Sequence, residues 1–225
     1  MLVAMTENQA RLEICRVGKS LFERGYVHAT AGNISVRLGG EAGEQGFIMT
    51  PTDACLGFLQ ADQLSKLDAQ GQHISGAPPS KTLALHRAIY AATGAQCIIH
   101  THSTHCVALT MGDSLPAELI PAITPYFVIK VGRVPVMPYR RPGHPAMAQM
   151  IAETIAAYQS RGTQLKAVML PRLGPNVWAN TPAAAMAILE ELEETAQLWF
   201  TVAPKPTPLN ATQLGELRAT FNAIW

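Results

Sequence analysis

The chain has 225 residues, 15% of them charged and 48% apolar, with a net charge of +1. This length suits one large domain, and the composition excludes both a disordered chain and a protein that mainly grips nucleic-acid phosphates. No apolar run approaches the ~20 residues that span a membrane, and the start lacks a signal-peptide pattern, so we expect a cytoplasmic protein without membrane contact. The low surface charge also favours association into an oligomer.

The first half of the chain alternates between helical and strand-like patterns. Apolar spacing predicts a helix over Thr6–Arg24, and regular alternation of apolar and polar residues predicts a half-buried strand over Asn33–Leu38. A short apolar strand over Gly46–Thr50 and a hairpin over Ser65–Ile74 follow. The next helix is expected over Ser80–Ala92, with Ser80 as its N-cap.

The second half continues the alternation. A strand over Cys97–His102 leads into a short helix over Ser103–Thr110 that begins at a capping serine. The valines and isoleucines of Tyr126–Tyr139 predict a strand. The later elements are helices over Pro145–Tyr158, Thr181–Val202 and Thr212–Ala223 and short strands over Ala167–Leu170 and Asn176–Ala179.

Interleaved helices and strands predict an α/β fold, here a single layered α/β/α domain. Because the strands come in hairpins as well as crossovers, the central sheet is expected to be mixed and largely antiparallel. We expect the main domain to cover residues 1–203. Residues 204–225 would form a Pro-rich tether and a C-terminal helix that packs on the same domain or on a neighbour.

The charges are unevenly distributed. Between Ala69 and Ala152 there are six basic and two acidic residues, a local balance of +4 (six minus two). The basic residues are Lys81, Arg87, Lys130, Arg133, Arg140 and Arg141. A positive segment in a neutral protein fits a small anionic substrate such as a phosphate or carboxylate. The alternative is that these side chains are scattered over unrelated surfaces.

The strongest local motif is His100-Thr101-His102, which follows an apolar strand. Residues i and i+2 of a strand point to one face, so both imidazole rings can reach one metal ion. The alternative is a pair of hydrogen-bonded histidines at a strand end, and a metal site needs at least a third protein ligand.

Three other segments carry groups that can hold an anion. They are Gly32-Asn33, Thr52-Asp53 and Ser80-Lys81, and each offers backbone N–H groups, hydroxyls or an ammonium at a turn or helix start. Each segment alone is also consistent with an ordinary turn.

In this order and spacing, the segments resemble the class II aldolase/adducin-type superfamily from about Glu7 to Phe200. The matching stretches are ATAGNISVRL, FIMTPTDACLGFL, PPSKTLALHRAIY, CIIHTHSTHC, TPYFVIKVGRVPVMPY and AVMLPRLGPNVWA. The segments RVGKSLFERGY, PPSK and HSTH are most similar to the branch that decarboxylates 3-oxo-tetronate 4-phosphates.

The resemblance implies roles for individual residues. His100 and His102 would bind a divalent ion, with zinc expected and manganese as the alternative. Tyr126 would pass a proton, and Lys81 would hold phosphate and could pair with a substrate carboxylate. The implied phosphate-binding residues are Gly32, Asn33, Thr52, Asp53, Ser80 and Lys81. The family is often a homotetramer with sites at subunit interfaces, so we expect a homo-oligomer, preferably a tetramer.

Two positions depart from the family pattern. Leu173 stands where a third histidine ligand is usual, and Thr82 stands where a glutamate acts as acid, base or ligand. Neither residue can replace the usual group, because leucine cannot ligate a metal and threonine does not exchange protons near neutral pH. His105 is expected to pack or cap rather than ligate, and His28 is a second candidate with a similar balance. His73 and His144 are expected to face solvent.

Three functions remain open. The first is a metal-dependent carbon–carbon lyase, a decarboxylase or aldolase, that acts on a small phosphorylated sugar or sugar acid through a metal-stabilised ene-diolate. The second is an inactive relative retained for binding or assembly, which the two departures favour. The third is a dehydratase or epimerase of the same family.

Overall fold

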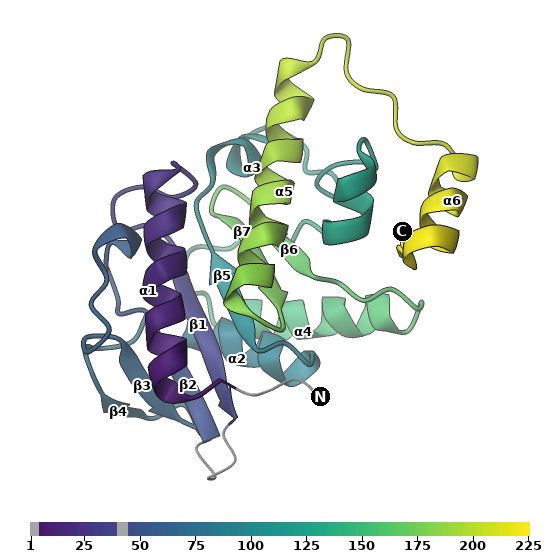
Figure 1. The fold of residues 1–225 in the computed structure, drawn as a ribbon. Coiled ribbons are helices and arrows are strands. Elements are labelled where there is room, and N and C mark those ends of the chain that lie inside the picture. Colours follow the sequence, from purple (N-terminus) through teal and green to yellow (C-terminus); the bar gives the residue numbers. More distant parts are fainter. Residues whose placement is uncertain (1–4, 40–44) are drawn as a thin grey trace.

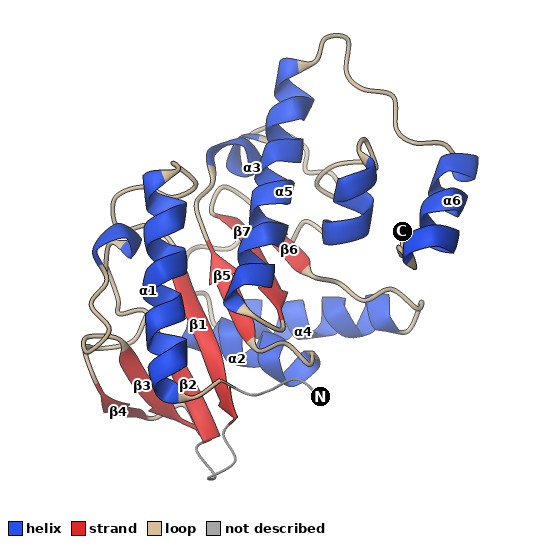
Figure 2. Cartoon of the chain, in the orientation of Figure 1, coloured by secondary structure: helices blue, strands red, loops and turns tan. Residues whose placement is uncertain are grey.

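The structure, a computed structural model, describes residues 5–39 and 45–225. Its centre is a sheet with the strand order β4-β3-β2-β1-β5-β7-β6 (Figures 1 and 2). The strands are β1 (Asn33–Gly39), β2 (Gln45–Met49), β3 (Ser65–Asp68), β4 (His73–Ser75), β5 (Cys97–His100), β6 (Ala167–Leu170) and β7 (Gly174–Ala179). Neighbouring strands all pair antiparallel, and Val136 adds an isolated parallel bridge to Met169. The sheet is therefore largely antiparallel, as predicted.

Helices cover both faces of the sheet, which gives the predicted α/β/α layers (Figure 1). On one face, α1 (Glu7–Glu23) and α5 (Pro182–Thr201) pack on β1, β5 and β7 around a fully buried apolar core. On the other face, α2 (Leu83–Ala92) and α4 (Ala146–Gln159) pack against each other over a second apolar cluster. Among the described residues, no helix is both long enough and apolar enough to cross a membrane.

The strand over Asn33–Leu38 exists but is not half-buried. Asn33 is 5% exposed and Ser35 is 1% exposed, so the polar face of β1 is buried as well. The cause is the position of β1 in the middle of the sheet, where α2 covers this face: Ser35 Oγ lies 2.7 Å from His86 Nδ1. Its alternating polar residues therefore form an internal polar layer.

The predicted strand over Tyr126–Tyr139 is wrong. Its first part is a turn of π-helix, η2 (Phe127–Val131), which ends at Gly132 with a φ of 79°. Phe127 and Val131 are buried against α5, so tertiary packing overrides the strand preference of this apolar run. The remainder makes isolated bridges at Pro135 and Val136 rather than a strand.

The C-terminal segment packs on η2 of the same chain. The short elements outside the two main layers are η1 (Leu56–Phe58), α3 (Thr104–Ala108) and α6 (Ala211–Phe221). Side chains of α6 join an apolar cluster with Val128, and the Trp225 ring lies 5.6 Å from the Phe127 ring, centroid to centroid. Leu209 anchors the segment before α6, because its N–H donates to the Ala122 carbonyl at 2.7 Å.

Candidate active site

A pocket of about 260 Å³ opens at the ends of two central strands of the sheet, where β1 begins and β5 ends. Antiparallel pairing brings these two strand ends together, and Asn33 is the direct partner of His100. The loops after β2 and before α2 complete one side of the pocket. The sequence-predicted residues that line it are Gly32, Asn33, Thr52, Asp53, Ser80, Lys81, His100 and His102.

Two histidines, His100 and His102, contribute polar side chains to the pocket lining. His100 Nδ1 donates to the Pro175 carbonyl at 2.9 Å, so its Nε2 carries a lone pair. Burial, and then the neighbouring His102, lower the pKa of His100 to about 4, so this ring is neutral near pH 7. Burial also lowers the pKa of His102, and the ring centroids are 5.1 Å apart. Such a pair can offer two neutral nitrogen ligands or accept hydrogen bonds from a ligand.

The third ligand of a family-type metal site is missing. Leu173 lines the same pocket. The next residue, Gly174, packs closely on the backbone between the two histidines, because a Cβ on Gly174 would lie 1.9 Å from the Thr101 carbonyl oxygen. Within residues 5–39 and 45–225, no three His, Cys, Asp or Glu side chains meet at a candidate metal site. The donor set therefore does not fit a catalytic zinc ion, which takes three protein ligands.

Thr82 positions a neighbour instead of supplying an acid or base. Its hydroxyl donates to Asn33 Oδ1 at 3.0 Å and lies 3.1 Å from Ser80 Oγ. The predicted N-cap at Ser80 is wrong, because α2 begins at Leu83 and Thr82 occupies the cap position without a side-chain cap bond. The Thr82 hydroxyl thus connects Ser80 to Asn33 in the lining of the pocket.

A buried polar layer lies behind the histidine pair, and sequence reasoning missed most of it. Ser35 Oγ contacts His86 Nδ1 and also lies 2.9 Å from the Tyr90 hydroxyl. Burial, and then His100, lower the pKa of His86 to about 3. In the described part of the chain, His86 Nε2 and both amide atoms of Asn176 have no hydrogen-bond partner. Asn176 is the direct β7 partner of His100, so its pairing register is the signal that would have identified it. Unpaired buried polar atoms cost stability, which favours a functional role for this layer.

The loop before α4 supplies lining residues that the sequence did not single out as site residues. Arg140, Arg141 and His144 face the pocket. His144 is half-buried and its Nδ1 accepts from the Ala146 N–H at 3.2 Å, so the expectation that it faces solvent is wrong. His73 on β4 is exposed, as expected. The positive charge of this part of the sequence was the available signal for the arginines.

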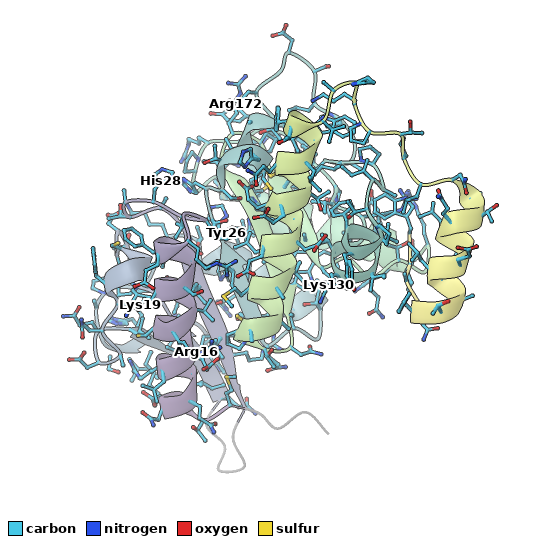
Figure 3. The ribbon with its side chains drawn as sticks, turned by 45° about the horizontal axis from the view of Figure 1, so that its top comes forward. Arg16, Lys19, Tyr26, His28, Lys130 and Arg172 are labelled. Atoms are coloured by element: carbon cyan, nitrogen blue, oxygen red, sulfur yellow. The ribbon has the colours of Figure 1, made fainter. Side chains whose placement is uncertain are left out.

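Tyr126, His28 and His105 lie outside the pocket lining. Tyr126 is 62% exposed and directly precedes η2. His28 is exposed on the loop after α1 (Figure 3). His105 Nδ1 donates to Glu193 Oε1 at 2.9 Å, which ties this ring to α5. Within one copy of the chain, the pocket therefore contains the anion-binding candidates and two histidines but not the proposed tyrosine.

Residues 12–200 match the family model of the class II aldolase and adducin N-terminal domain. A 3-oxo-tetronate 4-phosphate decarboxylase of Cupriavidus necator is 48% identical over 98% of this chain and 99% of the relative. The crystal structure of YgbL from Klebsiella pneumoniae, a candidate aldolase, epimerase or decarboxylase, is 41% identical with a TM-score of 0.83, covering 95% of this chain and 100% of that one.

A more distant relative is the L-fuculose phosphate aldolase of Methanococcus maripaludis (strain C7), 29% identical over 85% of this chain and 94% of the relative. The relatives thus include both decarboxylases and aldolases named for phosphorylated sugar substrates. The matched region contains every strand of the sheet and every predicted residue of the pocket. The chain belongs to the class II aldolase/adducin family.

Proposed function

We propose that this protein is a lyase that decarboxylates a small 3-oxo acid carrying a phosphate, of the 3-oxo-tetronate 4-phosphate type. The observation that carries the proposal is the pocket that joins Lys81 and the anion-binding candidates to the histidine pair. The 48% identity to a decarboxylase of that name supports this substrate class.

The phosphate is assigned to the side of the pocket formed by Gly32, Asn33, Thr52, Ser80 and Lys81. Gly32 has a φ of +85°, and a Cβ there would lie 2.7 Å from the His100 carbonyl oxygen, so only glycine allows this close approach of the loop. In the described structure Lys81 is exposed and has no ion-pair partner, which leaves its ammonium available to a ligand.

The reaction breaks the bond between the carboxylate carbon and C2. Its electron pair passes toward the C3 carbonyl, which gives an ene-diolate and carbon dioxide. Protonation of C2 then yields a three-carbon hydroxyketone phosphate. Lys81 is the cation assigned to offset the developing negative charge. No general base is needed to start this step, so Thr82 is compatible with decarboxylation.

The proton donor is assigned to Tyr126 of another copy of the chain, because Tyr126 is exposed and lies outside its own pocket. This assignment requires a homo-oligomer, and we propose a tetramer acting in the cytoplasm. The zinc or manganese ion implied by the family resemblance lacks a third protein ligand in the described chain, so no step is assigned to it.

The test supplies 3-oxo-tetronate 4-phosphate and L-fuculose 1-phosphate separately and measures carbon dioxide and carbonyl products. We expect carbon dioxide and a three-carbon phosphate from the first compound only. Lys81→Met should lower the rate about 100-fold, whereas Arg161→Gln, outside the pocket, should change it by less than about twofold. Aldehyde from the second compound would indicate an aldolase. No conversion of either compound would favour a binding or assembly protein.

A further inference from the structure

Two consecutive arginines, Arg140 and Arg141, line the same pocket from the loop that precedes α4. Both are exposed, and each guanidinium hydrogen-bonds to adjacent backbone: Arg140 Nη1 to the Tyr139 carbonyl at 2.9 Å, and Arg141 Nη1 to the Pro142 carbonyl at 3.1 Å. Within residues 5–39 and 45–225, neither arginine forms an ion pair. These two cations are therefore available to a ligand.

The charge of the pocket lining is unbalanced. Three cations, Lys81, Arg140 and Arg141, and one carboxylate, Asp53, line the described pocket, so its Lys, Arg, Asp and Glu side chains give a charge of +2 (three minus one). A single phosphate contact at Lys81 leaves both arginines unused. The excess fits a ligand with two anionic groups.

The arginines and the phosphate-binding candidates reach the pocket from different segments of the chain. Asn33 begins β1, which pairs with β5 on one side of His100. Val136, four residues before Arg140, bridges to Met169 of β6, the strand at one edge of the sheet. His100 and His102 line the same pocket as both sets of cations.

We propose that Arg140 and Arg141 form a second anion subsite that binds the substrate carboxylate and thereby selects 3-oxo acids over sugar phosphates without a carboxylate. This inference rests on the proposed function, because that function defines a substrate with a carboxylate and a phosphate at opposite ends. The carboxylate loses its charge as carbon dioxide forms, so the arginines hold the substrate more strongly than the transition state. Their removal is expected to raise KM without lowering kcat, whereas removal of Lys81 lowers kcat.

The test is calorimetric binding of two stable ligands, so it does not depend on turnover. Erythronate 4-phosphate carries both a carboxylate and a phosphate, whereas glycerol 3-phosphate carries only the phosphate. The variants are Arg140→Gln/Arg141→Gln, the charge-preserving Arg140→Lys/Arg141→Lys, and Arg161→Gln as a surface control. Thermal melting verifies that each variant is folded.

The wild-type chain should bind erythronate 4-phosphate at least about tenfold more tightly than glycerol 3-phosphate. The double glutamine variant should lose that advantage and bind glycerol 3-phosphate within about twofold of the wild type, with the double lysine variant in between. Equal losses for both ligands would place the arginines on the phosphate and overturn the proposal, as would unchanged binding of both. If the carboxylate preference is found but no carbon dioxide is released from the 3-oxo acid, the proposed function fails while the subsite stands.

Discussion

His100 Nδ1 lies 2.9 Å from the Pro175 carbonyl oxygen, and this hydrogen bond connects the end of β5 to the start of β7. It fixes the imidazole tautomer and directs the free Nε2 away from the backbone that holds it. The relationship connects fold and site, because the strand pairing that builds the sheet also orients the buried histidine.

Replacing His100 with alanine should lower both stability and activity. The Pro175 carbonyl would keep the Thr101 N–H at 3.4 Å but lose the shorter bond from His100. The loss of this bond is expected to cost about 0.5–1.5 kcal/mol. Urea unfolding would measure this loss, with His73→Ala on the exposed strand β4 as the matched control. If the two variants unfold at the same urea concentration, the hydrogen bond contributes nothing measurable to the fold.

Glu193 should make stability depend on acid pH. Burial acts to raise the pKa of this carboxyl, but hydrogen bonds from the His105 and Cys106 amides and side chains outweigh burial, and the pKa is lowered. The ionised carboxylate is thus favoured in the fold. Its contribution is complete above the ordinary glutamate pKa, about 4.3, and disappears as the pH falls through the lower folded value.

Glu193→Gln should therefore cost about 1–3 kcal/mol at pH 7 and much less near pH 3. Chemical denaturation at the two pH values would measure the difference. Glu23→Gln, at an exposed side chain of α1, is the matched control and should show no such dependence. An equal loss of stability for Glu193→Gln at both pH values would contradict stabilisation by the ionised carboxylate.

Leu173→His should increase zinc binding. Leu173 lines the pocket with His100 and His102, so a histidine there would supply the third ligand that the described donor set lacks. Elemental analysis after dialysis against zinc should give more metal per chain than in the wild type. Leu12→His, at an exposed position on α1, should leave the metal content unchanged. No gain for Leu173→His would show that position 173 does not face the histidine pair.

Tyr126 should act across a subunit interface. Tyr126→Phe should lower kcat without weakening binding of erythronate 4-phosphate, and Lys81→Met should disable the pocket. If each pocket takes its tyrosine from another copy, oligomers refolded from an equal mixture should recover about a quarter of wild-type activity, because one site in four combines both intact parts. Activity no greater than the mean of the two separate variants would refute this arrangement.

The sequence predicted most of the fold and one side of the pocket for identifiable reasons. Apolar periodicity located α1, because the spacing of apolar residues reflects which side faces the core. Turn residues located the hairpin of β3 and β4, and a Thr-Pro pair located the start of α5. It failed at Phe127–Val131, where an apolar run of strand-forming residues packs on α5 as a π-helical turn. Local composition does not encode that long-range contact.

Pocket residues were predictable where a motif carried them and not where only topology did. His100 and His102 share a short motif, whereas Asn176 joins the polar layer through strand register and Arg140 reaches the pocket from the loop before α4. Register and loop path depend on the whole sheet. Asn176 and Arg140 acquire their places at the site only through contact with segments that are distant in the sequence.

The most direct test of decarboxylation follows two atoms in one experiment: the carboxylate carbon of the substrate and the proton that is added at C2. 3-oxo-tetronate 4-phosphate labelled with carbon-13 in its carboxylate is incubated with the full chain in deuterium oxide and followed by nuclear magnetic resonance. If the protein decarboxylates this compound, the label appears entirely as carbon dioxide and the three-carbon phosphate carries a single new deuteron on the former C2. Label retained in a four-carbon product, or the same conversion rate with Lys81→Met, would contradict decarboxylation in this pocket.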